Sequence, residues 1–158
     1  MTIIIDITKQ QLFLHDANHA RVATYFISTA AKGVGEKKNS FQTPRGKHII
    51  RAKIGSNCPI FTVFRARRPT GEIFNEKLSA QFPDRDWILT RILWLSGCEV
   101  GVNRLGDVDT MQRFIYIHGT HDEKNIGTPG SHGCIRMRNQ DVMVLFDQVA
   151  VGEIVLIA

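Results

Sequence analysis

Short apolar runs separated by turn residues set the strongest constraint on how this chain can fold. The runs are rich in β-branched and aromatic residues, which favour strands over helices. They cover residues 2–7, 10–14, 21–28, 47–54, 59–64, 87–95, 114–118 and 153–157. Asp16, Ala17 and Asn18 lie between the second and third runs and favour a turn, so we expect antiparallel pairing there. The sequence therefore predicts a mostly β fold.

One segment near the C-terminus departs from this pattern and predicts an α-helix. Its apolar positions follow the i, i+3, i+4, i+7 spacing of a single buried face. They are Val142, Leu145, Phe146 and Val149. Asn139 is a suitable N-cap, Asp141 suits the positive end of the helix dipole, and Gly152 is expected to end the helix. A second, shorter helix can form within 72–82, where Pro83 limits it.

The stretch 96–110 is rich in Gly and Asp and leads into the apolar run that ends at His118. Long loops without secondary structure of their own are often functional. We therefore expect a long surface loop here that acts as a lid over a site. With 158 residues and no break in composition, the chain is expected to form one domain over residues 1–158.

The composition is that of an ordinary globular protein, because 43% of the residues are hydrophobic and 22% are charged. The N-terminus lacks the basic start and the apolar stretch of roughly 7 to 15 residues that a secretory signal requires. No apolar run approaches the roughly 20 residues of a membrane-spanning helix. We therefore expect a cytoplasmic protein without a membrane span, or a periplasmic one if a leader has been removed.

Cysteines are sparse in this chain and odd in number, which argues against a disulfide framework. They are Cys58, Cys98 and Cys134. Cys58 and Cys98 lie among apolar or turn residues, so we expect them to be small buried side chains. At least one thiol is expected to be free.

The net charge of +5 and the pI near 9.4 favour an anionic ligand. Basic residues cluster at 32–38, 45–53 and 65–68. A nucleic-acid-binding module would interleave aromatic residues with such clusters or show a known motif, and neither is found. A solvated basic surface is the simpler interpretation of these clusters, and a small polyanionic ligand is compatible with them. We expect no nucleic acid as partner, and the oligomeric state is not indicated.

The residues with the clearest chemical potential are His118 and Cys134. His118 ends an apolar strand, and a glycine-rich loop returns the chain to Cys134, which follows Gly133. A free thiol is only about 3% ionised at pH 7, so it needs a neighbouring base to attack a carbonyl. If His118 lowers the pKa of the thiol to roughly 6.5, the thiolate becomes the majority form. The amides of Gly133 and Cys134 are then candidates to stabilise an oxyanion.

Metal binding is an alternative, because four side chains that zinc accepts lie close together in the sequence. They are His118, His121, His132 and Cys134. Their spacing lacks the paired Cys-x2-Cys or His-x3-His pattern of common zinc sites, so the residues alone favour a thiol catalyst but leave zinc open.

Two stretches around these residues resemble a known family. Residues 131–137 (SHGCIRM), preceded by residues 115–120 (IYIHGT), resemble the signature of the L,D-transpeptidase (YkuD-like) catalytic domain. Residues 43–50 (TPRGKHII) resemble the Thr-Pro-x-Gly strand start of the same domain. The resemblance covers essentially the whole chain. It implies a β-sandwich or mixed sheet with one C-terminal α-helix and the lid-like loop.

The resemblance also implies a reaction. The family cysteine attacks the carbonyl of the L-configured centre of a peptidoglycan stem peptide, usually a diamino acid, and expels D-Ala to leave a thioester. Carried over by position, Cys134 is the nucleophile, His118 is the proton acceptor and donor, and Arg136 holds a substrate carboxylate or braces the loop. The residues that supply the oxyanion environment or orient the imidazole are Gly133, His132, Gly119 and Ser131. No metal or other cofactor is implied.

The thioester can be resolved by water or by an amine. Members without a leader resemble cytoplasmic L,D-carboxypeptidases that trim muropeptides in murein recycling, so hydrolysis is expected. The alternative is an L,D-transpeptidase that forms crosslinks or exchanges D-amino acids in the cell wall. A non-catalytic module that binds wall fragments is the alternative of another class.

Overall fold

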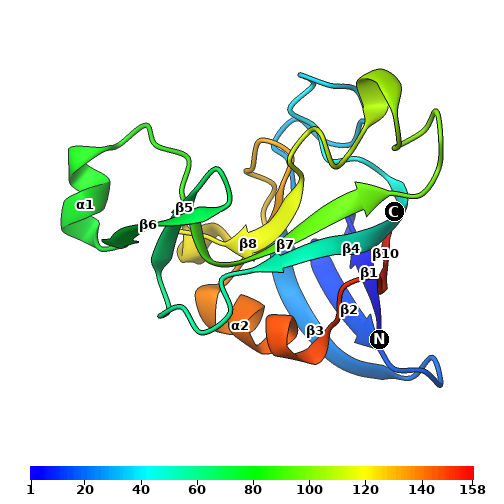
Figure 1. Ribbon diagram of the computed structural model, residues 1–158, viewed down its shortest axis with the longest axis horizontal. Helices are drawn as coiled ribbons and strands as arrows, with labels where there is room; N and C mark the ends of the chain where they lie inside the picture. The colour runs from blue at the N-terminus through cyan, green and yellow to red at the C-terminus, as the bar shows by residue number, and fades with distance from the viewer.

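The computed structural model describes residues 1–158, in which ten strands belong to one sheet (Figure 1). The strands are β1 (Thr2–Asp6), β2 (Gln11–His15), β3 (Arg21–Ser28), β4 (Gly46–Ile54), β5 (Thr62–Arg65), β6 (Arg68–Ile73), β7 (Ile88–Gly97), β8 (Tyr116–Gly119), β9 (Ile135–Met137) and β10 (Ile154–Ile157). The helices are α1 (Glu76–Gln81) and α2 (Asn139–Gln148), with short 3₁₀ turns at Gly106–Val108 and Glu123–Asn125. The predicted runs correspond to β1 to β5, β7, β8 and β10, so the mostly β fold is confirmed.

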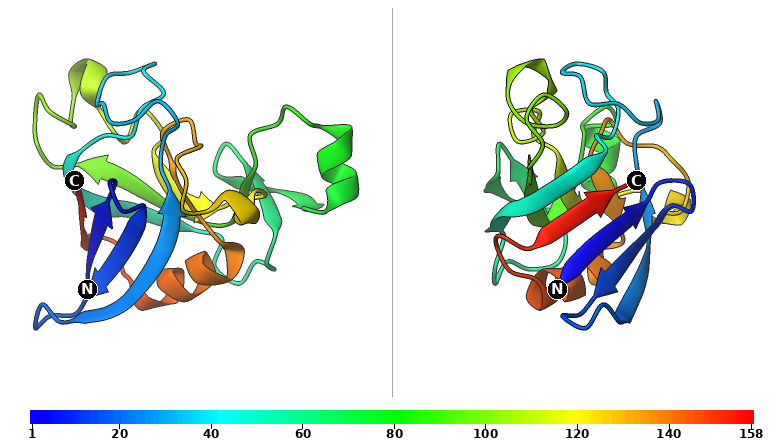
Figure 2. Two further views of the ribbon diagram at one scale, coloured as in Figure 1. Left: turned by 180° about the vertical axis from the view of Figure 1, so that it is seen from behind. Right: turned by 90° about the vertical axis from the view of Figure 1, so that its right-hand side faces the viewer.

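The sheet closes on itself. Its strand order is β4-β10-β1-β2-β3-β9-β8-β7, and β4 also pairs with β7, so the first and last strands of this order meet. The pairs β1–β10 and β8–β9 are parallel and the others are antiparallel, which makes the sheet mixed, as expected. Figure 2 shows the strands curving around a common interior, with both chain termini on the same side of the molecule.

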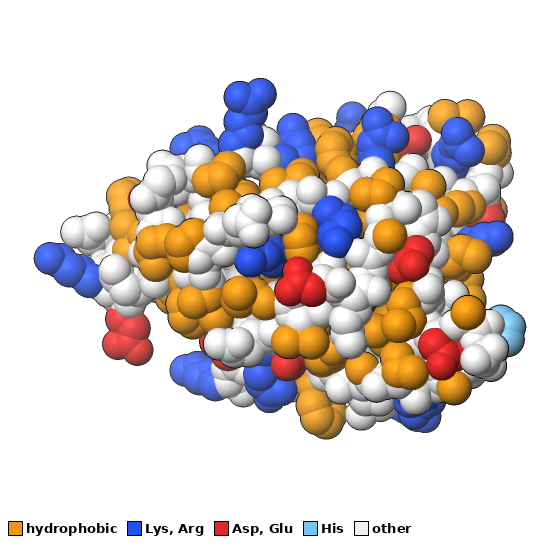
Figure 3. All heavy atoms as spheres, turned by 60° about the horizontal axis from the view of Figure 1, so that its bottom comes forward, with side chains coloured by type: hydrophobic (Ala, Val, Ile, Leu, Met, Phe, Trp, Pro, Cys, Tyr) orange, Lys and Arg blue, Asp and Glu red, His pale blue; other side chains and the backbone are white.

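Apolar side chains fill this interior. Along β1, Ile3 and Ile5 are fully buried and alternate with partly exposed neighbours, which is the period of two expected for a strand with one buried face. α2 packs against β7 and β8 and adds Val142, Leu145 and Phe146 to the main core. The predicted buried face of the helix is therefore confirmed. Basic side chains are scattered over the face drawn in Figure 3 and do not gather in one patch.

The start of α2 differs from the prediction. Arg138 occupies the N-cap position without a side-chain hydrogen bond, so the prediction of Asn139 as the cap is wrong. Asn139 is instead fully buried; its Oδ1 accepts a hydrogen bond from Thr90 Oγ1 at 2.6 Å and its Nδ2 donates to Thr120 O at 2.7 Å. A buried amide that meets two partners in this way joins α2 to β7 and to the end of β8.

The other helix predictions are confirmed in part. Asp141 lies in the first turn of α2, as expected for the positive end of the dipole. The helix ends at Gln148, and Gly152, with φ of 91°, lies in the turn before β10, so it does not end the helix. Within 72–82, the first residues belong to β6 and only Glu76–Gln81 is helical.

The hairpin of β5 and β6 extends beyond the closed part of the sheet together with α1 (Figure 1). It is attached where Val63 and Phe64 of β5 pair with β7. Its turn consists of Ala66 and Arg67, whose φ angles of 48° and 64° are the positive values of a tight hairpin turn. The sequence did not predict β6, because its Pro69 and Gly71 are residues that strands usually exclude.

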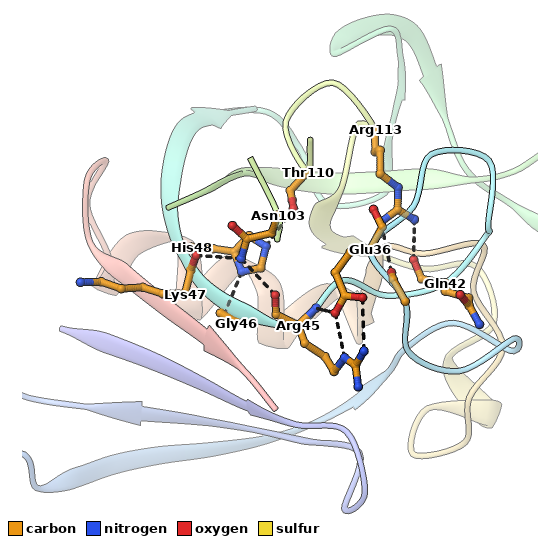
Figure 4. Close-up of polar contacts among 10 residues, drawn as sticks. Glu36, Gln42, Arg45, Gly46, Lys47, His48, Asn103, Thr110 and Arg113 are labelled. Carbon is orange, nitrogen blue, oxygen red and sulfur yellow. Dashed lines mark hydrogen bonds and ion pairs between the residues drawn. The ribbon is translucent and has the colours of Figure 1, made fainter. Parts of the chain in front are cut away.

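The loop after β7 is tied to the start of β4. Asn103 is fully buried and its Nδ2 donates to Arg45 O at 3.0 Å and Lys47 O at 3.1 Å (Figure 4). His48 Nε2 lies 2.9 Å from Thr110 Oγ1. These contacts connect 98–110 to the strand opposite, so this loop is an ordered part of the fold.

Candidate active site

His118 and Cys134 come together because β8 and β9 are adjacent parallel strands. His118 is in register with Arg136 of β9, and Cys134 directly precedes that strand. Both side chains line one cavity of about 350 Å³. No hydrogen bond joins the thiol to the imidazole in this structure. The predicted pair therefore shares a cavity without being in direct hydrogen-bonded contact.

Backbone groups hold the Cys134 thiol on two sides. Tyr116 N–H donates to Sγ at 3.3 Å, and Sγ–H donates to Phe114 O at 3.4 Å. Burial raises the pKa of the thiol to about 12, and although the Tyr116 amide and the guanidinium groups of Arg136 and Arg113 act in the opposite direction, burial prevails. The condition under which the thiolate would predominate is therefore not met in the free protein, because desolvation outweighs the stabilising charges.

The His118 imidazole is oriented through its other nitrogen. Nδ1 lies 2.7 Å from Gly119 O, and since a carbonyl only accepts, Nδ1 must carry the proton. Nε2 then keeps its lone pair and is available as a base. Burial lowers the pKa of His118, so the ring is neutral at pH 7. The site at rest combines a neutral thiol with a neutral imidazole.

The turn before Cys134 is held by two hydroxyl groups. Ser131 Oγ accepts from Gly133 N–H at 3.1 Å and donates to Cys134 O. Thr43 Oγ1 donates to Gly133 O at 2.9 Å and accepts from Ala30 N–H at 3.0 Å. Because the Gly133 amide is already used by Ser131, the expectation that it faces an oxyanion is not met.

Two other amides near the thiol are unpaired. The N–H groups of His132 and Cys134 make no hydrogen bond to the rest of the protein. The amide of Cys134 belongs to the same residue as the thiol, so it replaces the amide of Gly133 as the candidate oxyanion donor. The His132 side chain is exposed and lines the same cavity. Its ring is in a T-shaped arrangement with that of Phe41, with the two ring centroids 6.0 Å apart.

Gly133 is needed for the backbone conformation that it adopts. Its φ of 130° lies in the region that side chains rarely adopt, and an added Cβ would lie 3.2 Å from Gln42 O and 3.1 Å from Ile115 Cδ1. The sequence-based view of Gly133 as an unshielded donor is therefore replaced by a conformational role, in which the chain turns sharply to present the next residue.

Arg136 braces the loop that carries Cys134. Its Nη1 donates to Gly130 O at 3.2 Å, and its Nη2 lies 3.6 Å from Asp86 Oδ1. The side chain is only 11% exposed but lines the cavity. Of the two roles that the sequence left open for this residue, these contacts correspond to bracing.

Arg113 contributes to the site and was not found from the sequence. Its guanidinium donates to four groups of one loop: Gly35 O at 3.3 Å, Glu36 O at 3.1 Å, Ser40 Oγ at 3.3 Å and Gln42 O at 2.7 Å. Figure 4 shows Arg113 beside Glu36 and Gln42. It lines the cavity beside Cys134. Three of its partners are backbone carbonyls, which any residue provides, so no sequence pattern indicates this contact.

The cavity walls come from segments other than the expected lid. Phe64, Ala66 and Arg67 of the β5–β6 hairpin form one side, and the residues from Arg113 to Tyr116 form another. None of the lining residues belongs to 96–110, so the prediction that this loop covers the site is wrong. Its hydrogen bonds to β4 hold it at a different edge of the sheet.

The zinc alternative is not supported by the geometry. No group of three or more His, Cys, Asp or Glu side chains is placed to hold a metal ion. His118, His132 and Cys134 line the cavity, whereas His121 does not, and its ring centroid lies 6.0 Å from that of Phe74. The four candidate ligands therefore do not form one site.

Comparisons with known proteins agree on one family. The model of the L,D-transpeptidase catalytic domain (YkuD) matches residues 1–157. Probable L,D-transpeptidase YbiS of Escherichia coli strain K12 is 50% identical over 40 residues, which are 25% of this chain and 13% of that protein. Putative L,D-transpeptidase YqjB of Bacillus subtilis strain 168 is 49% identical over 45 residues, or 28% of this chain and 26% of that protein. The matched part thus spans about a quarter or less of either relative.

Solved structures share the fold. The L,D-transpeptidase from Mycobacterium smegmatis aligns with 99% of this chain and 58% of its own, with a TM-score of 0.57 and 16% sequence identity. Identity at this level supports the fold and not a shared substrate. Because the family model matches nearly the whole chain, however, this protein belongs to the L,D-transpeptidase catalytic domain (YkuD) family.

Proposed function

We propose that this family member is a cysteine acyl-enzyme catalyst that cleaves peptidoglycan stem tetrapeptides between the L-centre of the diamino acid and the terminal D-Ala. The observation that carries the proposal is the shared cavity of Cys134 and His118, in which His118 Nδ1 is bonded to Gly119 O and Nε2 is free to act as a base. A thiol, a base and an unpaired amide beside one cavity are the parts that acyl transfer needs.

The first half of the reaction forms the thioester. Sγ transfers its proton to His118 Nε2 as the sulfur attacks the carbonyl carbon, and the Cys134 N–H donates a hydrogen bond to the carbonyl oxygen, on which negative charge develops. When the tetrahedral intermediate collapses, the bond to the D-Ala nitrogen breaks, and His118 returns the proton to that leaving amine. Because the thiol pKa is raised to about 12, proton transfer accompanies attack and does not precede it.

The second half releases the peptide, and we propose water as the acceptor. His118 Nε2 removes a proton from the water as it attacks the thioester, and the thiolate leaves and regains a proton. The products are a tripeptide and, from the first half, D-Ala. The protein is then an L,D-carboxypeptidase of murein recycling.

The surroundings suit an anionic peptide. Three arginines line the cavity, Arg67, Arg113 and Arg136, against the single carboxylate of Asp86. Stem peptides carry free carboxylates, so a cavity with this charge favours them over neutral peptides.

We extend the proposal to a reducing compartment, the cytoplasm. All three cysteines are free. Cys58 and Cys98 were expected to be buried, but in the structure both are only half-buried. Free thiols persist where the environment keeps them reduced. Neither α1 nor α2 has the length and apolar character needed to cross a bilayer.

Transfer to an amine is the second candidate, because a further cavity adjoins the first. It has a volume of about 240 Å³ and shares Arg113, Phe114, Ile115 and His132 with the cavity of Cys134. A second stem peptide seated there would place an amine near the thioester, and the product would be a crosslink or an exchanged D-amino acid.

Incubation with a murein tetrapeptide, followed by mass spectrometry, tests the proposal. Tripeptide and D-Ala are expected from the unaltered protein, no product from Cys134→Ala, and full activity from the matched thiol variant Cys98→Ala. Crosslinked dimers or exchanged D-amino acids would mean that an amine, and not water, is the acceptor in the second half of the reaction. Absence of any product, or product formation by Cys134→Ala, would overturn the proposed chemistry.

A further inference from the structure

The basic cluster at 65–68 has no part in the chemistry proposed so far. It forms the tip of the β5–β6 hairpin, where Arg65 and Arg68 pair across the turn and Ala66 and Arg67 make it. Of these arginines only Arg67 lines the cavity of Cys134. The turn gives both central residues positive φ, a conformation that Gly or Asn would adopt with less strain. Strain of this kind at the wall of a site points to a function for the side chain it presents.

Arg67 is held in a fixed orientation beside the thiol. Its guanidinium lies over two aromatic rings, 5.0 Å from the centroid of Trp94 and 4.7 Å from that of Phe114. Its Nη1 donates to Tyr116 Oη at 3.1 Å. Tyr116 is also the residue whose amide contacts Cys134 Sγ, so a single tyrosine connects the guanidinium to the nucleophile.

The three arginines that line the cavity differ in how many partners their guanidinium groups already have within the protein. Arg113 donates to four groups of the 35–42 loop. Arg136 is engaged by Gly130 O and Asp86. Arg67 makes one hydrogen bond, to Tyr116, although a guanidinium has five N–H donors. Stacking on aromatic faces leaves the edge of the guanidinium plane free, and that edge is the part that binds a carboxylate through two parallel hydrogen bonds.

We propose that Arg67 is the specificity residue of this cavity and binds a carboxylate of the stem peptide, with Trp94 and Phe114 orienting its guanidinium. The inference rests on the proposed function, which supplies a peptide with free carboxylates. It assigns to the hairpin arginine the carboxylate-binding role that the sequence had offered for Arg136. It also predicts that a neutral amide at the recognised position is a poor ligand.

Binding to the inactive Cys134→Ala protein, measured by calorimetry, isolates recognition from chemistry. The probes are the tetrapeptide and three singly amidated forms, with the amide at the terminal D-Ala, at the diamino acid or at the α-carboxyl of D-glutamate. One amidated form is expected to bind about 10- to 100-fold more weakly than the tetrapeptide, as loss of a charge-assisted pair implies. The identity of that form tells which carboxylate Arg67 holds.

Variants of the hairpin then test whether Arg67 causes this preference for the free carboxylate over its amide. Arg67→Gln should bind all four peptides with the weak affinity of the discriminated amide, and Arg67→Lys should restore only part of the preference, because lysine lacks the planar fork. Arg68→Gln removes the same charge from the same hairpin outside the cavity and should keep the full preference.

Two results would overturn the inference. In one, Arg67→Gln weakens every peptide by the same factor while the preference for the free carboxylate persists, which would make Arg67 a purely structural contact. In the other, no amidated form is discriminated. Turnover of the tetrapeptide by the unaltered protein separates these from failure of the proposed function: if the tetrapeptide is cleaved, only the role of Arg67 fails, and if it is neither bound nor cleaved, both fail.

Discussion

The Cys134 thiol lines the cavity in its neutral form. Backbone contacts from Tyr116 and Phe114 aim the sulfur, while burial raises the pKa of the thiol to about 12. His118 is neutral for the same reason, since burial lowers its pKa. Desolvation disfavours both charged forms, so the pair avoids an isolated buried ion in the empty cavity. In the proposed reaction, charge develops only when a carbonyl carbon is present for the sulfur to attack.

This resting state predicts an unusual pH dependence for alkylation of Cys134 by iodoacetamide. In a protein whose other two cysteines are replaced by Ser, the rate should rise about tenfold per pH unit from about pH 7 to about pH 10, because only the thiolate reacts and the pKa lies above this range. In denaturant the same thiol should level off near its ordinary pKa of about 8.5. A plateau below about pH 8 in the folded protein would instead indicate a thiolate–imidazolium pair.

At the scale of the element, the turn before β9 is assembled by distant parts of the chain. Thr43 reaches Gly133 O from the segment before β4, and Ser131 bridges Gly133 and Cys134 within the turn. Arg136, on β9 itself, holds Gly130 O. The short strand β9 is too small to fix this geometry alone, so the flanking hydrogen bonds determine where Cys134 points.

Gly133→Ala tests the importance of this turn. The φ of 130° and the contact of an added Cβ with Gln42 O and Ile115 predict a loss of about 1 to 3 kcal/mol in the free energy of unfolding, together with a large drop in turnover. Gly130→Ala is the matched control, because its Cβ would meet no atom closer than 3.9 Å. Urea unfolding and the tetrapeptide assay measure both effects. Equal, small effects of the two substitutions would contradict a conformational requirement at Gly133.

At the scale of the whole molecule, closure of the sheet brings distant loops together near the start of β4. Asn103 connects the 98–110 loop to Arg45, and Arg113 donates to Glu36 O (Figure 4). Glu36 in turn forms an ion pair with Arg45 at 2.8 Å. His48 lies beneath them, fully buried, with Nδ1 3.1 Å from Gly46 O and Nε2 2.9 Å from Thr110 Oγ1. Polar groups this deeply buried are tolerated because each has a partner.

His48 predicts an acid-sensitive fold. Burial lowers its pKa to about 4, below the 6.5 of the unfolded chain, so below pH 6.5 the unfolded state binds the proton and the folded state does not. Stability from this residue is complete above pH 6.5 and falls as the pH drops toward 4, by about 3 kcal/mol in all. Urea unfolding at a series of pH values should show this decline. His48→Gln should flatten it, although at a lower stability, whereas the exposed His19→Asn should leave it intact. A decline of the same slope in His48→Gln would assign it to other groups.

Patterns of neighbouring residues along the chain were enough to predict the local features of this protein. Short runs of β-branched and aromatic residues predicted most of the strands, helical spacing of apolar residues predicted the buried face of α2, and the SHGCIRM stretch indicated the family and the candidate cysteine, because these patterns depend only on neighbours along the chain. Their partners could not be read in the same way. That β4 meets β7, that Asn139 is buried and does not cap, and that Arg67 and Arg113 reach the cavity all follow from contacts between distant residues.

The protonation state of the site also belongs to the tertiary structure. Residue types alone suggested a thiolate, yet the pKa of Cys134 is set by how much water the folded cavity excludes, and only the packing of β8, β9 and the β5–β6 hairpin decides that. The sequence therefore indicated the candidate reacting groups, and the folded structure decided their charge, their hydrogen-bond partners and which arginine of the cavity has the fewest of its donors paired.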